Sequence, residues 1–599
     1  MGAIAGFYGQ IVSKQELMKV TDTLHRRSPG GWESLEVPRG LLITGKGQEE
    51  VLKPWDQRLW DSGEEYLLCF SGKLDNRKAL FEELSALGHG FRGESDREVV
   101  LHAFAHWGRD CFIRLHGRYS FAIFEQRAQR LTLVRDKLGI SSLFYRFTGG
   151  HLQFGSEIKT VLAFPGVRAR LTKEGAAQLL LFSPGRIPGS GIFEDIRELE
   201  PGCCAVFCGE KQELVRYWRL QDGEHREDLP QTAEHIRALL TDSVAGKTAG
   251  HSCFGTLLSG GLDSSILTAI CAGSQPGKEL QTFSVDYRNN RRNFVPGKFQ
   301  PDSDESYIDQ MVETFSCRHR RTVLTPEDLC DRLQQAAQAR DLPGMGDVDS
   351  SLMAFSEQVK NFVPMVLSGE CADEIFGGYP WFRDPEIRMQ SGFPWAQNTS
   401  ARAALLNFSF PQAEEMVMDA CSDTCRSADI LPGTSKEERR IKELTVLNLR
   451  WFMQTLLERN DRMTAACGLD VRVPFCDDRI AQYLYTVPWE MKNLEGREKG
   501  LLRYAVKGLL PERIRLRKKS PYPKTFDPQY EKMLESLLAP LWQEDRSLWY
   551  LLRRSGAEQL LESSEATPFY GQLMRRPQIM AWLWQTDWWL THYMVDFCF

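Results

Sequence analysis

The sequence predicts an α/β protein built from at least two domains. Its 599 residues exceed what a single hydrophobic core normally organises. Residues 1 to about 205 alternate short strands with helices, whereas long helical patterns alternate with short apolar strands from Thr232 onward. The second pattern is typical of a doubly wound α/β core, in which a ligand lies outside the carboxyl ends of the strands.

The N-terminal part contains four apolar segments with the length and flanking turn residues of β-strands. These segments are residues 3–8, 66–70, 120–124 and 131–136, and residues 98–107 have a helical pattern. Residues 221–231 are charged and contain Pro230, which indicates a linker. We therefore expect a domain over 1–215, a linker over 216–231 and a second domain over 232–599.

A loop rich in glycine and serine follows an apolar segment and precedes a helical pattern. It reads Leu-Leu-Ser-Gly-Gly-Leu-Asp-Ser-Ser over residues 257–265. Gly260 and Gly261 let the backbone approach a polyanion closely, and the helix start adds unpaired N–H groups and a positive dipole end. Asp263 stands where a carboxylate can hold the Mg²⁺ of a nucleotide. No Gly-Lys-Ser/Thr follows at the required spacing, so this is not a Walker A loop.

A second polar loop follows another predicted strand. Residues 366–379 place the carboxylates of Glu370, Asp373 and Glu374 within five positions. Val-Leu-Ser-Gly precedes them and Ile-Phe-Gly-Gly-Tyr follows, which is unusual for a surface charge cluster. Because both loops follow strands of one predicted sheet, we expect both at the carboxyl edge of that sheet.

These motifs together resemble the asparagine synthetase B family. Its synthetase domain is matched by the two loops and by residues 340–345, 461–475 and 517–525. The first loop is also similar to the pyrophosphate loop of N-type ATP pyrophosphatases, which cut ATP to AMP and pyrophosphate. The resemblance covers nearly the whole chain. It implies an Ntn-type αββα glutaminase-like domain followed by a doubly wound α/β ATP-pyrophosphatase domain.

The resemblance implies a role for each site residue. The residues that the resemblance places against the nucleotide and its pyrophosphate are Leu258, Ser259, Gly260, Gly261, Asp263, Ser264, Val285, Ser368 and Gly369. Asp263 and Asp373 support Mg²⁺, and Lys519 neutralises the departing phosphate. Arg462 occupies a second position that is basic in the family. Glu370 is the general base that takes a proton from the attacking amine.

Other interpretations of these residues remain open at this point. Tyr379 either lines the acyl pocket or packs in the core. Without the family match, Lys519 fits a solvated basic turn, and Glu370 fits a carboxylate in the first turn of a helix. Residues 334–340 form a polar helical pattern, which we expect to be a solvated face rather than part of a site.

The N-terminal half departs from the family where glutamine is hydrolysed. The family nucleophile is the cysteine that follows the initiator methionine, whereas this chain has Gly2, which has no side chain. The family's Asn-Gly-Glu loop reads Ser-Gly-Lys over residues 71–73, and its Arg-Gly-Pro-Asp run reads Arg-Ser-Pro-Gly over residues 27–30. Only Ser-Asp at residues 95–96 is well retained. We therefore expect the glutaminase fold without glutaminase activity.

Three functions remain open. The first is an ammonia-dependent asparagine synthetase, which makes asparagine, AMP and pyrophosphate from aspartate, ATP and ammonia. The second is a related amide synthetase or cyclase, similar to β-lactam synthetases and lasso-peptide cyclases, with another acid and amine. The third is a non-catalytic pseudoenzyme. A homodimer and a separate amidase that supplies ammonia are compatible with the first two.

Composition narrows the partners and the location. A net charge of −6 gives no electrostatic case for nucleic acid or an acidic membrane. The first residues do not read as a signal peptide. The Trp-rich stretch 582–599 is interrupted by polar residues, which favours an amphipathic helix over a membrane anchor. The 15 cysteines lack zinc-ligand spacing, so we expect reduced thiols, no structural metal and a cytoplasmic protein.

Overall fold

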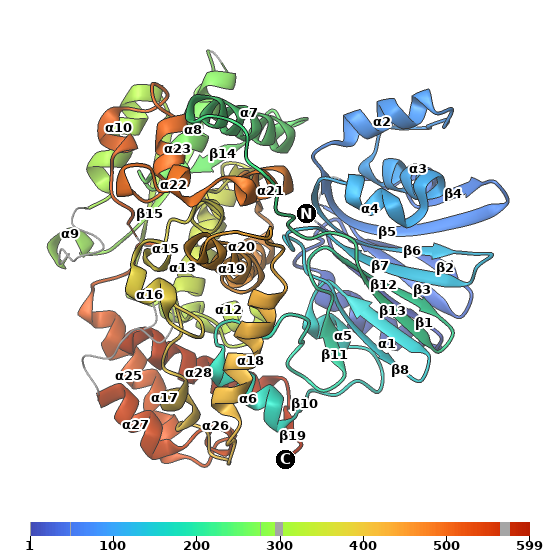
Figure 1. The fold of residues 1–599 in the computed structure, drawn as a ribbon. Helices are drawn as coiled ribbons and strands as arrows, with labels where there is room; N and C mark the ends of the chain where they lie inside the picture. Colours follow the sequence, from blue (N-terminus) through green and yellow to red (C-terminus); the bar gives the residue numbers. More distant parts are fainter. Residues whose placement is uncertain (1, 48–49, 276, 294–302, 521, 563–574) are drawn as a thin grey trace. The chain divides into compact units, whose positions relative to one another are not determined.

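The computed structural model divides the chain into two compact units (Figure 1). The structure describes residues 2–47, 50–275, 277–293, 303–520, 522–562 and 575–599. Unit 1 contains Met1–Thr172, Pro188–Arg219 and Asp596–Phe599, and unit 2 contains Lys173–Ile187 and Leu220–Val595. The segment 173–187 thus belongs to unit 2 although unit 1 residues flank it on both sides. Within the expected linker, α7 (Leu229–Thr248) already begins at Leu229.

Unit 1 is built on two six-stranded antiparallel sheets. The first has the order β11-β8-β9-β1-β3-β2, and the second has the order β13-β12-β7-β6-β5-β4. The strands of the first sheet are β1 (Ile4–Tyr8), β2 (Trp32–Val37), β3 (Gly40–Gly45), β8 (Phe144–Thr148), β9 (His151–Gly155) and β11 (Ile196–Glu198). Those of the second are β4 (Arg58–Asp61), β5 (Glu64–Leu74), β6 (Gly117–Glu125), β7 (Arg130–Arg135), β12 (Cys203–Cys208) and β13 (Lys211–Arg216).

Apolar side chains from both sheets of unit 1 meet in one core. Ile4 and Phe154 of the first sheet share a cluster with Cys69 and Phe124 of the second. The helices α1 (Lys14–Leu24) and α5 (Ile158–Leu162) cover the outer face of the first sheet, and α2 (Arg77–Ala86), α3 (Asp96–Trp107) and α4 (Cys111–Arg114) cover that of the second. This αββα layering confirms the predicted fold, and the predicted strands and helix appear as β1, β5, β6, β7 and α3.

Unit 2 contains a parallel five-stranded sheet of order β16-β15-β14-β17-β18. Its strands are β14 (Gly255–Leu257), β15 (Gln281–Tyr287), β16 (Arg318–Leu324), β17 (Met365–Leu367) and β18 (Asp470–Arg472). The strand order reverses between β14 and β17, which makes their carboxyl ends the expected ligand crevice. Helices α12 (Leu333–Arg340), α13 (Asp347–Lys360) and α20 (Met453–Ala466) share an apolar cluster with this sheet. The doubly wound prediction is confirmed.

The register of β14 and β17 brings the two polar loops together. Gly255 pairs with Val366 and Thr256 with Leu367, so the two strands end within one residue of each other. Helix α8 (Leu262–Ser274) begins after the first loop and α14 (Ala372–Phe376) after the second. A Cβ built on Gly369 would lie 3.0 Å from the Cβ of Asp263, so glycine allows this close approach.

The expectation of a solvated face over residues 334–340 fits only the glutamines, of which Gln334 is exposed, and is wrong for the alanines and Arg340. Helix α12 contacts α13, α20 and α28 (Arg576–His592), and its alanines are buried. Small side chains let the neighbouring helices approach closely, and Arg340, which is 1% exposed, is buried in an ion-pair cluster. Polar composition alone did not predict this burial, because the Arg340 charge is paired with Asp349 inside the unit instead of being hydrated.

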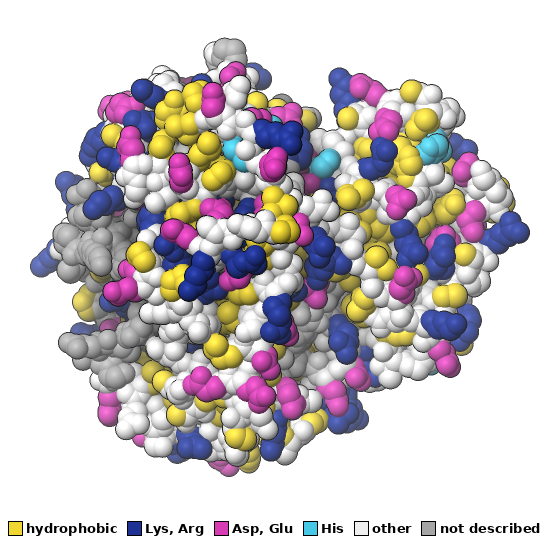
Figure 2. Space-filling view, viewed as in Figure 1, with side chains coloured by type: hydrophobic (Ala, Val, Ile, Leu, Met, Phe, Trp, Pro, Cys, Tyr) yellow, Lys and Arg dark blue, Asp and Glu magenta, His cyan; other side chains and the backbone are white. Residues whose placement is uncertain are grey.

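Two further observations concern the surface and the membrane. On the face drawn in Figure 2, basic and acidic side chains of the described residues are intermixed, as a net charge of −6 leads one to expect. Among the described helices, none combines the length and the hydropathy needed to cross a membrane.

Candidate active site

A cavity of about 290 Å³ opens where β14, β15 and β17 end. Twelve of the predicted site residues line it: Leu258, Ser259, Gly261, Asp263, Ser264, Val285, Ser368, Gly369, Glu370, Asp373, Tyr379 and Lys519. Gly260 and Arg462 are not among the lining residues. The structure therefore brings together side chains that lie up to 261 positions apart, from Leu258 to Lys519.

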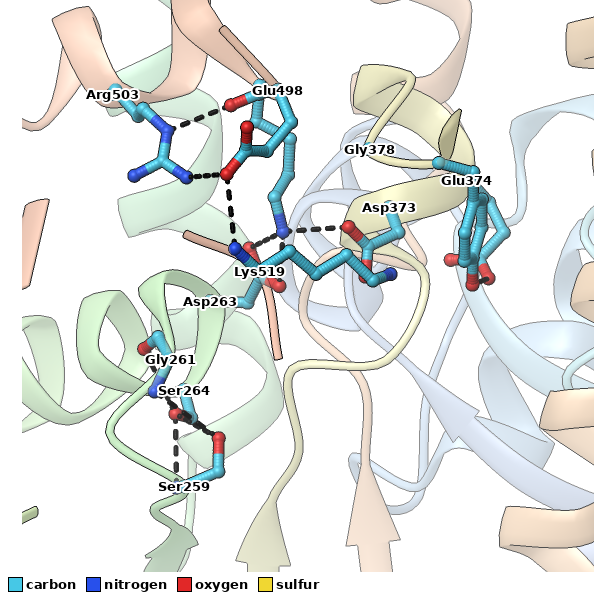
Figure 3. Close-up of polar contacts among 12 residues, drawn as sticks. Ser259, Gly261, Asp263, Ser264, Asp373, Glu374, Gly378, Glu498, Arg503 and Lys519 are labelled. Atoms are coloured by element: carbon cyan, nitrogen blue, oxygen red, sulfur yellow. Dashed lines mark hydrogen bonds and ion pairs between the residues drawn. The ribbon is translucent and has the colours of Figure 1, made fainter. Parts of the chain in front are cut away.

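The first loop is held by its own hydroxyl groups (Figure 3). The oxygens of Ser259 and Ser264 are 3.1 Å apart, and the amide of Ser259 donates to the Ser264 hydroxyl at 3.2 Å. The amide of Gly261 donates to the Ser259 hydroxyl at 3.4 Å. These bonds fix the backbone at the start of α8, where free N–H groups favour an anion.

Gly260 does not line the cavity; at this glycine the loop packs closely against a neighbouring helix. Its φ of +68° lies in the left-handed region, and a Cβ there would come within 2.8 Å of the Tyr307 Cβ. Tyr307 lies on α10 (Glu305–Phe315). Arg517 also crosses this point, since its guanidinium stacks on the Tyr307 ring and donates to the Ser259 carbonyl at 3.2 Å. Glycine is therefore required by packing as well as by conformation.

The buried Lys499 and the partly buried Lys519, Asp263 and Asp373 form a charged cluster beside the loop, in which Figure 3 labels Lys519 and the two aspartates. The Lys499 ammonium lies 2.6 Å from Asp263 and 2.8 Å from Asp373. The Lys519 ammonium lies 2.5 Å from the other oxygen of Asp373. Burial raises the pKa of Asp373, but the attraction of Lys499 and Lys519 outweighs burial. The pKa of Asp373 therefore lies below its ordinary value, and the carboxylate stays ionised. Burial raises the pKa of Asp263, with Lys499 opposing and Asp373 adding to the rise.

Lys499 is a site residue that sequence reasoning missed. It is 3% exposed and immediately precedes α23 (Gly500–Ala505), with a left-handed φ of +55°. Its only local signal is a lysine next to a glycine in a polar stretch, which is common on protein surfaces. What identifies it is proximity to Asp263 and Asp373, and tertiary folding alone creates that proximity.

Among the described residues, no group of three or more His, Cys, Asp or Glu side chains forms a metal site, so a divalent cation beside the serine-glycine loop (residues 257–265) would have only Asp263 and Asp373 as protein ligands. The carboxylates of Asp263 and Asp373 both contact the Lys499 ammonium, which occupies the point between them, so an ion would have to bind these carboxylates from another side. Carboxylate oxygens are the kind of protein ligand that Mg²⁺ favours. These two aspartates would hold the ion.

Lys519 is positioned through both its backbone and its side chain. Its amide donates to the Glu498 carboxylate at 3.1 Å, and Arg503 holds the same carboxylate at 2.8 Å. The ammonium lies 3.9 Å from the centre of the Tyr379 ring. The Tyr379 hydroxyl donates to Glu374 at 2.5 Å, which anchors that ring in the wall. Burial and the nearby Asp373 raise the pKa of Glu374 to about 7.

Glu370 faces the cavity between this cluster and a buried arginine. Its side chain is 25% exposed, and the Arg459 Nη1 atom lies 4.0 Å from its Oε1. Burial raises the pKa of the Glu370 carboxyl, Arg459 opposes the rise and Asp373 adds to it. A carboxylate with a raised pKa is better matched to accepting a proton near neutral pH.

Arg462, predicted to be a catalytic residue, does not line the cavity. Arg462 is 1% exposed on α20 and lies behind the cavity wall. Burial raises the pKa of nearby Glu458, but Arg186, Arg340 and Arg462 outweigh it and lower the pKa to about 2. Arg459, three residues earlier on α20, lines the cavity.

Aromatic side chains line the end of the cavity near Tyr379. The Tyr379 ring stacks on Trp381 at 4.4 Å and meets Phe452 edge-on at 5.0 Å. These three rings give this end an apolar wall. Such a wall excludes water from a reactive intermediate.

In unit 1, two residues that depart from the glutaminase pattern, Gly2 and Lys73, have defined surroundings. The Lys73 ammonium is 3.2 Å from Asp96, so the inverted charge at position 73 neutralises the retained acid. A Cβ built on Gly2 would lie 2.7 Å from the Gly45 carbonyl oxygen. The backbone at position 2 therefore has no room for a side chain without a local shift.

Comparisons with known proteins agree over both units. A family profile described as asparagine synthase matches residues 235–591, and a glutamine amidotransferase domain profile matches residues 1–218. The chain is 39% identical over 609 residues to asparagine synthetase [glutamine-hydrolyzing] 3 of Bacillus subtilis (strain 168), covering 98% of both chains. It is 24% identical over 493 residues to asparagine synthetase [glutamine-hydrolyzing] 1 of the same organism, covering 77% and 76%. Asparagine synthetase [glutamine-hydrolyzing] 2 of Arabidopsis thaliana is 24% identical over 534 residues, covering 85% and 75%.

Proposed function

The chain belongs to the asparagine synthase family, and on that premise we propose that it is an ammonia-dependent amide ligase. It activates a carboxylate, aspartate first among candidates, as an acyl-adenylate with release of pyrophosphate, and ammonia then attacks the acyl carbon. The observation that carries this proposal is the cluster of Lys499, Lys519, Asp263 and Asp373 between the serine-glycine loop and Glu370.

In the first half-reaction the chain neutralises and orients phosphate groups. The amides of the serine-glycine loop and the α8 N-terminus face the leaving pyrophosphate. Lys519 supplies a compact positive charge as charge builds on the phosphate oxygens. Asp263 and Asp373 would hold a Mg²⁺ ion, which when bound would supply further neutralisation of the phosphate charge. The apolar wall near Tyr379 keeps water from the adenylate.

In the second half-reaction the chain removes a proton. The amine nitrogen forms a bond to the acyl carbon while the bond to the AMP oxygen breaks. Glu370 accepts the proton that the nitrogen must lose. Its raised pKa makes it a stronger base than an exposed glutamate.

The nitrogen source is ammonia and not glutamine. The relatives named above are described as glutamine-hydrolysing, but Gly2 offers no nucleophile and Lys73 pairs with Asp96. Unit 1 then acts as a structural partner, and ammonia comes from solution or from a separate amidase.

A second candidate is favoured by the aromatic wall. Tyr379, Trp381 and Phe452 provide more apolar surface than a small acid such as aspartate needs. An amide synthetase or cyclase with a bulkier acid or amine would use the same adenylation residues and the same base.

Acid-dependent exchange of labelled pyrophosphate into ATP tests the proposal over a panel of acids. Exchange with aspartate, and amide formation on adding ammonium, supports the first candidate. Exchange only with another acid supports the second. No exchange with any acid would leave a non-catalytic protein and end both.

A further inference from the structure

A chain of buried charges runs from Glu370 into the interior of unit 2. Behind Glu370 lies Arg459, whose Nε atom is 3.5 Å from Asp349. Asp349 is also 3.5 Å from Arg340, which in turn is 3.7 Å from Glu458. Behind Glu370, each member of the series is at least nine-tenths buried: Arg459, Asp349, Arg340 and Glu458. The mechanism above uses only Glu370 from this series.

The Arg459 guanidinium is held on every side except the one that faces Glu370. Its Nε and Nη2 atoms donate to the Val348 carbonyl at 3.3 and 2.8 Å. Its plane lies over the Tyr522 ring, 4.3 Å from the ring centre. The remaining Nη1 atom is the one that lies 4.0 Å from Glu370. A planar fork fixed in this way presents a charge at a defined place.

Asp349, which forms the 3.5 Å ion pair with Arg459, is itself fixed. Asp349 lies in the first turn of α13 and accepts a hydrogen bond from the Met345 amide at 2.8 Å. The far end of the series is tied to the segment 173–187. Arg186 holds both oxygens of Glu458, at 3.0 and 2.8 Å, and Arg340 donates to the Pro184 carbonyl at 3.0 Å. The series therefore has a rigid support on the side away from the cavity.

We propose that Arg459 is a positioning residue for the amide-forming step, and that Asp349 is its anchor. Arg459 holds the Glu370 carboxylate at the acyl end of the cavity, so that it can take the proton of the attacking amine. The inference rests on the proposed function. It adds that Arg459 and Asp349 affect amide formation more than adenylation, because pyrophosphate release needs no base.

The experiment separates the two half-reactions in full-length protein. Pyrophosphate–ATP exchange with the accepted acid reports adenylation, and amide formation with ammonium reports the complete reaction. The variants are Arg459→Lys, Arg459→Gln and Asp349→Asn. Arg320→Gln is the matched control, because Arg320 also stacks on an aromatic ring, that of Phe362 at 4.1 Å, but does not line the cavity.

In Arg459→Gln, amide formation should fall at least roughly tenfold more than exchange. Arg459→Lys should recover part of this difference, because charge returns without the fork. Asp349→Asn should change the ratio in the same direction, although Asp349 does not line the cavity. Thermal melting of each variant checks that the fold is retained.

Equal losses in both half-reactions for Arg459→Gln, in folded protein, would overturn the inference while leaving the proposed function intact. An unchanged ratio in Asp349→Asn would overturn the anchoring role. Wild-type protein without exchange for any acid would instead overturn the proposed function, so the two failures are distinguishable.

Discussion

The ammonium of Lys499 contacts both carboxylate oxygens of Asp263, at 2.6 and 2.8 Å, although 236 positions separate the two residues. The same nitrogen lies 2.8 Å from Asp373. Lys499 therefore joins the helices that follow β14 and β17. It also allows two partly buried carboxylates to remain charged side by side, because each has a cation as its nearest partner.

Replacement of Lys499 by methionine should abolish most adenylation. We expect exchange to fall by about two orders of magnitude, because the two carboxylates lose a buried counter-charge. Stability should fall by about 3 kcal/mol for the same reason, measurable by denaturant unfolding. Lys518→Met is the control, since Lys518 is exposed and does not line the cavity. Full exchange in Lys499→Met would contradict the assigned role.

Replacement of Glu370 by glutamine should separate the two half-reactions. Amide formation should fall by about 10²–10⁴-fold, the range typical for loss of a general base. Exchange should stay within about tenfold, because pyrophosphate release needs no proton acceptor. The control is Glu357→Gln, an acid that pairs with Arg332 away from the cavity. A parallel loss of both activities would show that Glu370 is not the base.

The pH profile of amide formation should report Glu370. Only the ionised carboxylate can accept a proton, so activity is lost as the pH falls through its pKa. Burial and the nearby Asp373 raise that pKa, although Arg459 opposes them, so the acidic limb should lie above that of an ordinary glutamate. The rate of amide formation and the rate of exchange, measured from pH 4.5 to 9, should differ in this limb. An amide-formation limb at the pH of an exposed glutamate would argue against the assignment.

Glutamine should not replace ammonium, and a cysteine at position 2 should not restore its use. Gly2→Cys would place a Cβ 2.7 Å from the Gly45 carbonyl, and Lys73 would still neutralise Asp96. We expect no glutamate from glutamine in either protein, measured by amino-acid analysis. Amide formation with ammonium is the positive control. Glutamate release by the wild-type protein would disprove the loss of glutaminase activity.

Two glycines near the start and the end of α8 should respond in opposite ways to alanine. Gly260→Ala adds a Cβ at a φ of +68° and against Tyr307, so it should destabilise by about 1–2 kcal/mol and weaken ATP binding. Gly273→Ala adds a Cβ into open space within the helix and should stabilise by about 0.5–1 kcal/mol. Chemical unfolding and the ATP dependence of exchange measure both effects. A stable, fully active Gly260→Ala would refute the packing role of this glycine.

Sequence motifs, read together with their resemblance to the asparagine synthetase B family, predicted the fold classes and most of the cavity lining. The serine-glycine loop and the carboxylate loop each follow a short apolar strand, and a parallel sheet brings such strand ends to one edge. Their residues therefore meet once the strand order is known. Apolar segments bounded by turn residues likewise predicted β1, β5, β6 and β7, whose residues are buried along most of each strand.

Tertiary structure alone decided the charged partners. Arg462 and Arg459 lie three positions apart on α20, and nothing in the sequence says which one faces the cavity. Arg340 belongs to a stretch whose composition suggests a solvated face, yet it is buried against Asp349. Lys499 has no motif of its own. Sequence patterns report hydrophobicity and backbone preference, which act locally, whereas the pairing of buried charges depends on distances between segments far apart in the chain.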